Sequence, residues 1–157
     1  DFFTLMQPGA IFINAARGEV VDEQALIEAV PKLGAVVIDT WNNEPDVNEE
    51  LIELADIATP HIAGYSFQGK LNGTMMSVRA VASFLGIDEL KDFIPVDDVS
   101  EHHPVGIDLK GKNHGEIAAV LQYNYPIFTD DFRFRMEPHK FEKLRSDYQY
   151  RREIFVI

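Results

Sequence analysis

The sequence predicts an α/β protein whose first part forms a parallel β-sheet, and three observations support this prediction. Short apolar runs alternate with amphipathic segments along residues 1–64. The apolar runs have hydrophobic residues at consecutive positions, which is typical of strands buried on both faces. Each amphipathic segment is long enough to connect one parallel strand to the next by a right-handed crossover.

The expected elements follow from these runs and from the residues that interrupt them. We expect strands at residues 11–14, 35–41 and 57–59. Asp22 is a suitable N-cap for a helix between the first two strands, and Pro31 ends that helix. A shorter helix between the second and third strands begins after Asp46 or Asn48, which are both N-capping residue types.

A long amphipathic helix is expected after the third strand, over residues 67–85, where apolar residues recur at steps of three and four. Gly86 is placed to end this helix. Residues 94–98 have the composition of a linker, and the pattern beyond them changes to an α+β type. We expect a strand at 105–109, helices within 117–125 and 141–148, and a final strand at 154–157.

The composition argues against several classes of protein. The 157 residues have a formal net charge of −12, with the basic residues scattered among more numerous acids, so no nucleic-acid partner is expected. There is no cysteine, which excludes disulfides and thiolate zinc sites, and we expect no metal site. No apolar run is long enough to cross a membrane, and the opening residues lack the pattern of a signal peptide. We therefore expect a cytoplasmic protein.

Polar side chains follow each of the three expected strands. Arg17 comes after the first strand, Asp39 and Glu44 after the second, and His61 after the third. Because ligands of open parallel sheets bind at the carboxyl ends of the strands, these side chains are expected to share one cleft. Each alone has a simpler explanation: the Arg as a surface ion-pair partner, the Glu as a solvated side chain and the His as a hydrogen-bonded loop residue. Their order and placement favour a site.

The same three loops resemble the signature motifs of a known enzyme family. The runs INAARGEVVDEQAL, VVIDTWNNEP and TPHIAGY are similar, in this order, to those of the D-2-hydroxyacid dehydrogenases. The resemblance implies that Arg17 binds the substrate carboxylate and polarises the C2 oxygen. It also implies that Glu44 hydrogen-bonds His61, and that His61 exchanges the C2 hydroxyl proton while a hydride passes to or from nicotinamide. These three are the candidate catalytic residues.

The resemblance also implies NAD as the cofactor. Asp39 matches the family residue that contacts the nicotinamide side of NAD. Ala15, Ala16 and Gly64 match backbone positions that line the cofactor, with Arg17 beside them. These five residues are the candidate cofactor-binding residues.

Two further runs resemble one branch of this family. HIAGYSFQGKLNGT is similar to a loop in which a Tyr touches the phosphorylated substrate, and Tyr65 occupies that place. Tyr65 and Arg17 are therefore the candidate substrate-binding residues. FEKLRSDYQYRRE is similar to the C-terminal dimerisation domain of the same branch, which implies a homodimer. The implied reaction oxidises a phosphorylated small 2-hydroxy acid, 4-phospho-D-erythronate, to 3-hydroxy-2-oxo-4-phosphooxybutanoate in pyridoxal 5'-phosphate (vitamin B6) biosynthesis.

On this resemblance the chain divides into three parts. Residues 1–64 are expected to form the second half of a doubly wound, Rossmann-type NAD-binding sheet. Residues 65–92 are expected to be a crossover helix and linker returning to the substrate domain, and residues 93–157 a small α+β dimerisation domain. The G-x-G-x-x-G fingerprint of the pyrophosphate site does not occur in the sequence. We therefore expect the C-terminal part of a longer enzyme, inactive without the upstream half.

Two alternatives remain open at this point. One is another dehydrogenase of the same family, acting on phosphoglycerate, glyoxylate or hydroxypyruvate. The other is an NAD-sensing co-repressor that keeps the three candidate catalytic residues but acts through protein partners. Turnover with each acid separates the enzymes, whereas slow turnover with NAD-dependent partner association indicates the co-repressor.

Overall fold

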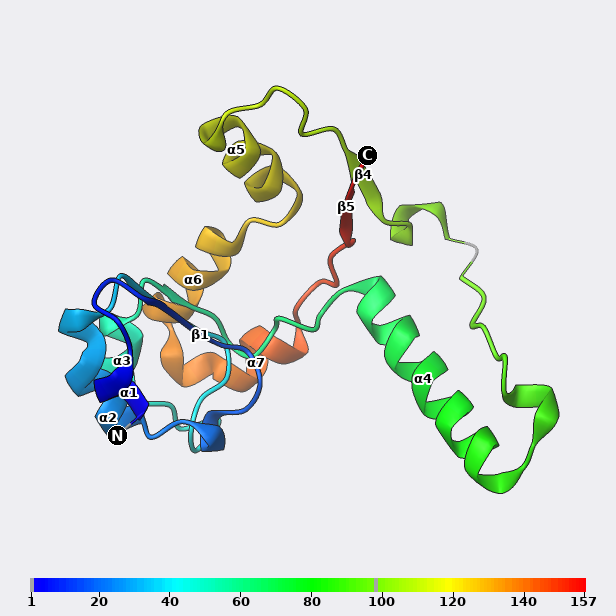
Figure 1. Ribbon diagram of the computed structural model, residues 1–157, viewed down its shortest axis with the longest axis horizontal. Coiled ribbons are helices and arrows are strands. Elements are labelled where there is room, and N and C mark those ends of the chain that lie inside the picture. Colours follow the sequence, from blue (N-terminus) through cyan, green and yellow to red (C-terminus); the bar gives the residue numbers. More distant parts are fainter. Residues whose placement is uncertain (1, 98) are drawn as a thin grey trace. The chain divides into compact units, whose positions relative to one another are not determined.

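The chain folds into two compact units. The structure, a computed structural model, describes residues 2–97 and 99–157. The first unit contains the residues up to Ala63 together with Pro126–Tyr148. The second contains Gly64–Tyr125 together with Gln149–Ile157. Figure 1 shows the elements of both in chain order, coloured from blue to red.

The first unit contains the predicted parallel sheet. Its strands are β1 (Ile11–Asn14), β2 (Ala35–Ile38) and β3 (Ile57–Ala58), which pair in parallel in the order β1-β2-β3. This arrangement confirms the predicted α/β class and the parallel sheet. Both β2 and β3 end earlier than predicted, and the residues beyond them form loops.

One strand is less buried than its apolar run predicts. Asn14 at the end of β1 is buried, but Ile11 and Ile13 are 65% and 64% exposed. These two side chains share one face of β1, and β1 is an edge strand of the described sheet. No described element packs closely on that face. The run therefore identifies a strand correctly but not its degree of burial.

The helices between the strands begin at predicted capping residues. α2 (Glu23–Ala29) follows Asp22, whose side chain accepts the backbone N–H of Ala25 at 3.1 Å. α3 (Glu49–Leu54) follows Asn48, one of the two predicted candidates, which accepts two N–H groups of the first turn. The shorter helical elements of this region are α1 (Phe2–Leu5) and the 3-10 turns η1 (Gly18–Val20) and η2 (Val30–Lys32).

Two helices from late in the chain complete the core of the first unit. α6 (Ile127–Met136) and α7 (Phe141–Ser146), separated by η5 (Pro138–Lys140), bury Phe134 and Phe141. Their rings join a core of Phe3, Leu26, Val36, Ile38, Trp41, Leu51, Ile52, Ala55 and Ala58. The compact units therefore differ from the predicted division, in which residues 93–157 form one domain. Helical spacing of apolar residues shows that a helix has an apolar face, but not which core that face joins.

The second unit contains the predicted long helix. α4 (Phe67–Leu85) follows Ser66, whose hydroxyl accepts the backbone N–H of Gly69 at 2.8 Å. It ends at Gly86, which has the left-handed conformation (φ 71°) typical of a C-terminal glycine. In the part of the chain that the structure describes, no helix is both long and apolar enough to cross a membrane.

The rest of the second unit contains two strands and one further helix. β4 (Val105–Ile107) and β5 (Ile154–Val156) pair in parallel, and α5 (His114–Asn124) lies between them in the sequence. The 3-10 turns are η3 (Asp88–Leu90) and η4 (Ser100–His102). The predicted linker at 94–98 has no regular secondary structure over 94–97, and Asp98 lies outside the described residues.

Candidate active site

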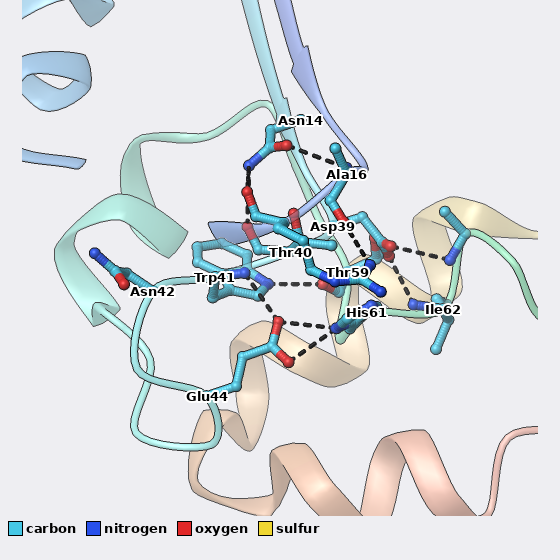
Figure 2. A network of polar contacts seen from close by, with 12 residues as sticks. Asn14, Ala16, Asp39, Thr40, Trp41, Asn42, Glu44, Thr59, His61 and Ile62 are labelled. Carbon is cyan, nitrogen blue, oxygen red and sulfur yellow. Dashed lines mark hydrogen bonds and ion pairs between the residues drawn. The ribbon is translucent and has the colours of Figure 1, made fainter. Parts of the chain in front are cut away.

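Three loops at the carboxyl ends of β1, β2 and β3 contain most of the predicted site residues (Figure 2). Arg17 follows β1, Asp39 and Glu44 follow β2, and His61 follows β3. All four belong to the first unit. The parallel arrangement of the strands places the loops on one rim of the sheet, as the sequence predicts.

Glu44 and His61, called the candidate pair below, are in direct contact. Nδ1 of His61 lies 2.8 Å from Oε2 and 3.0 Å from Oε1 of Glu44, so the ring donates its Nδ1–H to the carboxylate. Each side chain is 21% exposed. Within the described residues, Nε2 of His61 has no hydrogen-bond partner. The pair therefore offers one imidazole nitrogen for proton exchange, with a carboxylate placed to stabilise the protonated ring.

Asp39 holds the loop that contains His61. The residue is 4% exposed, and its carboxylate accepts the Thr59 hydroxyl at 2.7 Å. It also accepts the backbone N–H groups of Ile62 at 2.8 Å and Ala63 at 3.0 Å. His61 itself has φ 56°, in the left-handed region that residues other than glycine rarely adopt. The bonds to the next two residues stabilise this backbone conformation and thereby the direction of the imidazole.

Trp41 is part of the second loop and bonds to the third, and the sequence patterns do not single it out. Its backbone N–H donates to Oε1 of Glu44 at 3.0 Å, and its indole Nε1–H donates to the carbonyl oxygen of Thr59 at 2.9 Å (Figure 2). The one feature of the sequence that points to a role for Trp41 is its position, since the single Trp of the chain falls between Asp39 and Glu44.

Arg17 lies on the same rim, but among the described residues its guanidinium bonds only to a neighbouring backbone. Nη1 donates to the carbonyl of Ala16 at 2.7 Å, and the residue is exposed. The loop is held by Asn14, whose side chain donates to the carbonyl of Arg17 at 3.0 Å and accepts the N–H of Ala16 at 3.1 Å. A Cβ on Gly18 would lie 2.0 Å from the carbonyl of Trp41, so only glycine permits this approach of the two loops. The backbone is therefore fixed while the cation is exposed.

The rim fits the nicotinamide end of NAD. Ala15 and Ala16 are exposed and have the smallest side chains after glycine, so a flat ring can lie close to the backbone there. Oδ2 of Asp39 accepts one bond from the protein, that of Ala63, and a carboxylate oxygen can accept a second. These residues are therefore compatible with the predicted cofactor.

Gly64 and Tyr65 belong to the second unit. Gly64 is exposed. The Tyr65 ring packs edge-on against Tyr150 with ring centres 5.6 Å apart, and the ammonium group of Lys70 lies 4.2 Å from the centre of the Tyr65 ring. In the first unit, the structure brings Glu44 and His61 into contact and places Asp39 and Arg17 on the same rim.

Known proteins resemble the chain over most of its length. Residues 1–63 match the family described as "D-isomer specific 2-hydroxyacid dehydrogenase, NAD binding domain". The "Erythronate-4-phosphate dehydrogenase" of Bacteroides thetaiotaomicron is 40% identical over 98% of this chain and 42% of its own length. Proteins of the same name from Teredinibacter turnerae and Porphyromonas gingivalis are 37% and 41% identical, over 97% and 92% of this chain and 43% and 39% of their own lengths. The chain spans about two fifths of these relatives and matches their C-terminal part.

The matched residues 1–63 include all three loops of the rim. The family's description names NAD, which confirms the predicted cofactor. Residues 1–63 are thus similar to the NAD-binding domain of the D-isomer-specific 2-hydroxyacid dehydrogenases.

Proposed function

We propose that the protein containing this chain oxidises 4-phospho-D-erythronate to 3-hydroxy-2-oxo-4-phosphooxybutanoate with NAD. The contact between Glu44 and His61 is the observation that supports this most directly, since it combines a proton acceptor with a charge that stabilises the protonated form. The relatives' shared name supports the choice of substrate.

In the proposed reaction His61 accepts the proton of the C2 hydroxyl group at Nε2. The C2 hydrogen leaves as a hydride with the electron pair of its bond, and C2–O becomes a carbonyl. NAD, when bound, supplies the acceptor for that hydride. Glu44, 2.8 Å from Nδ1, stabilises the imidazolium that forms. In the reverse direction His61 starts protonated and returns its proton to the oxygen.

Arg17 binds the substrate carboxylate in this proposal. Its guanidinium is exposed on the rim and bonds only to an adjacent carbonyl among the described residues, so it can turn toward an anion. A planar guanidinium donates two parallel hydrogen bonds to a carboxylate. A local cation is needed because the chain as a whole has a net charge of −12 and repels an anionic substrate.

The remaining site residues are proposed on their match to the family motifs. Ala15, Ala16 and Gly64 line the cofactor and Asp39 contacts its nicotinamide side, in addition to holding the His61 loop. Tyr65 contacts the phosphorylated substrate. The exposure of the three small residues supports their part of the proposal.

The proposal extends to the setting of the enzyme. The reaction belongs to pyridoxal 5'-phosphate biosynthesis in the cytoplasm, and this chain is inactive without an upstream half that binds the pyrophosphate. The protein forms a homodimer through residues 93–157. Exposed apolar side chains, which are enriched at interface cores, support the last point; in the second unit they include Val99, Tyr123, Phe155, Val156 and Ile157.

Steady-state turnover of the complete protein tests the proposal. NAD reduction is followed with 4-phospho-D-erythronate, 3-phosphoglycerate and glycerate as substrates, and NADH oxidation with glyoxylate and hydroxypyruvate. A kcat/KM for phosphoerythronate at least about 100-fold above that for glycerate, glyoxylate and hydroxypyruvate is expected, because a site built for a charged substituent discriminates strongly against its absence. A smaller preference over 3-phosphoglycerate is expected, since that acid keeps the phosphate group. A preference for another acid refutes the substrate. Slow turnover with all of them, together with NAD-dependent binding of a protein partner, refutes the enzyme and favours the co-repressor.

A further inference from the structure

Trp41 joins the two loops that contain the candidate pair. Its backbone N–H holds the carboxylate of Glu44 at 3.0 Å, and its indole N–H holds the carbonyl of Thr59 at 2.9 Å. The same carbonyl accepts the backbone N–H of His61 at 3.0 Å. One buried residue therefore fixes the carboxylate on one loop and the backbone next to the imidazole on the other (Figure 2).

The orientation of the indole is set by residues from late in the chain. Phe134 of α6 packs edge-on against the Trp41 ring with ring centres 5.4 Å apart. Phe141 of α7 packs in turn against the ring of Phe134, with ring centres 5.8 Å apart. All three rings are buried in one core. Edge-to-face contacts between aromatic rings restrict their relative orientation, so α6 restrains the direction of the indole N–H.

α6 is also bonded to the strand that leads into the third loop. Asp131 accepts the backbone N–H of Ala58 at 2.6 Å, and Arg135 pairs with Asp131 at 2.9 Å. Ala58 is the residue before Thr59, whose carbonyl the indole holds. α6 therefore reaches the third loop by two routes, through the indole and through the end of β3.

We propose that Trp41 is a positioning residue for the candidate pair and that Phe134 of α6 holds it in place. This rests on the proposed function, because positioning affects a rate only if the pair is catalytic. A buried indole has one donor, which must be satisfied, so its bond to Thr59 fixes the separation of the two loops. A displacement of about 1 Å at a reacting group is enough to lower a rate about 100-fold.

Packing alone is the simpler role for these rings, and it makes a different prediction. A residue that only fills the core changes the fraction of molecules that are folded. It leaves the isotope effect of each folded molecule unchanged. A positioning residue changes the chemical step itself, so the isotope effect separates the roles.

Trp41→Phe in the complete protein tests the first half of the proposal. Phe keeps a ring beside Phe134 and keeps the backbone N–H to Glu44, but it has no donor for the carbonyl of Thr59. We expect kcat with 4-phospho-D-erythronate to fall about tenfold, with the KM for NAD changed less than about twofold. The isotope effect on kcat with the C2-deuterated acid should rise, because the chemical step becomes slower relative to product release.

Phe134→Leu and Phe141→Leu test the second half as a matched pair. Both replace a buried ring of the same core by the same side chain, but within the described residues Phe134 packs its ring against the indole and Phe141 packs its ring against Phe134. We expect Phe134→Leu to raise the isotope effect as Trp41→Phe does, and Phe141→Leu to keep the parent value. Equal effects of the two leucine variants, or a parent-like isotope effect in Trp41→Phe, would overturn the proposal.

A proton resonance keeps this test separate from the proposed function. The Nδ1–H of His61, hydrogen-bonded to Glu44, should give a low-field, exchange-protected proton signal in the parent protein. We expect this signal to broaden or disappear in Trp41→Phe and Phe134→Leu and to remain in Phe141→Leu. A parent that oxidises none of the acids refutes the proposed function, while the resonance still decides the positioning: an unchanged signal in Trp41→Phe overturns it.

Discussion

Asp39→Asn is expected to loosen the loop that contains His61 while leaving the sheet intact. The carboxylate accepts three hydrogen bonds, one from the Thr59 hydroxyl and two from the backbone N–H groups of Ile62 and Ala63. The two atoms divide this task, since Oδ1 accepts the first two and Oδ2 the third. Asn has one acceptor oxygen, so one of the three donors must lose its partner.

The size of the effect follows from this geometry. A hydrogen bond to a charged acceptor contributes about 1.5–3 kcal/mol and one to a neutral acceptor about 0.5–1.5 kcal/mol, so each retained bond weakens by about 1 kcal/mol. The Asn amide N–H would face the N–H of Ala63, whose contact with Asp39 is part-buried, and the loss of this acceptor costs about 1 kcal/mol. The neutral amide is easier to bury than the carboxylate, which offsets part of the loss. We expect a net destabilisation of the loop of about 2 kcal/mol.

Amide hydrogen exchange measures this loss where it occurs. A local destabilisation of about 2 kcal/mol corresponds to about 30-fold faster exchange through local opening. We expect at least that increase at Ile62 and Ala63, measured by mass spectrometry of peptides covering residues 59–64. Asp56→Asn is the control, because Asp56 is exposed and accepts a single backbone N–H, that of Val36, at 2.7 Å. Its replacement keeps an acceptor oxygen and should leave the His61 loop unchanged.

Parent-like hydrogen exchange in Asp39→Asn would refute the idea that Asp39 stabilises the loop that contains His61. If such a variant also bound NAD more weakly, the role of Asp39 would reduce to the proposed cofactor contact. An equal increase in Asp56→Asn would show that loss of a carboxylate loosens the whole unit and not this loop in particular. Only faster exchange confined to residues 59–64 of Asp39→Asn supports the reasoning.

Three further predictions concern the other contacts of the site. Glu44→Gln should lower kcat about 10–100-fold with little change in the KM for NAD, since His61 loses the charge 2.8 Å from Nδ1; an unchanged kcat in steady-state assays would remove Glu44 from the mechanism. Gly18→Ala should lower the free energy of unfolding in urea by at least about 2 kcal/mol, because the new Cβ would lie 2.0 Å from a neighbouring carbonyl group; a stable variant would show that the two loops can separate. Asp131→Ala should cost about 2–4 kcal/mol in the same assay because the N–H of Ala58 loses its acceptor, whereas Asp131→Asn, which keeps an acceptor, should cost less; equal losses would contradict this explanation.

The sheet and the shared rim could be predicted from local patterns. Consecutive apolar residues identify the strands, and residues that follow parallel strands share one rim. The hydrogen bond between Glu44 and His61 was implied by the resemblance of the loops to the family motifs. The two residues are 17 positions apart in sequence and meet because β2 and β3 are adjacent.

The contribution of α6 could not be predicted in this way. Asp131 bonds to Ala58 across 73 residues of sequence, and no local pattern reports a partner at that distance. The pair Asp130 and Asp131 has the sequence pattern of a helix start or a turn, and Asp130 lies in the first turn of α6. This pattern does not indicate that Asp131 bonds to Ala58. The proposed role of Trp41 could not be predicted from local patterns for the same reason, because it depends on the distant residue Phe134.

The position of α6 and α7 also decides how the proposed dimer is to be tested. Deleting residues 93–157 would remove Phe134 and Phe141 from the core of the first unit. Loss of one buried Phe side chain costs about 3–5 kcal/mol, so removing both approaches the whole stability of a typical domain, about 5–15 kcal/mol. A monomer obtained by such a deletion would therefore have two explanations, unfolding of the first unit and loss of the interface.

A single charge on the second unit avoids this ambiguity. Val156 on β5 is 65% exposed, and Val156→Asp leaves every residue of the first unit in place. If β5 lies in the proposed interface, an uncompensated buried carboxylate destabilises the dimer by several kcal/mol. Sedimentation velocity should then show a monomer, while hydrogen exchange at residues 59–64 remains as in the parent. Val156→Thr, which keeps the branched shape without the charge, should remain a dimer. A dimeric Val156→Asp protein would exclude β5 from the interface. Faster exchange at residues 59–64 would show that the substitution had disturbed the first unit.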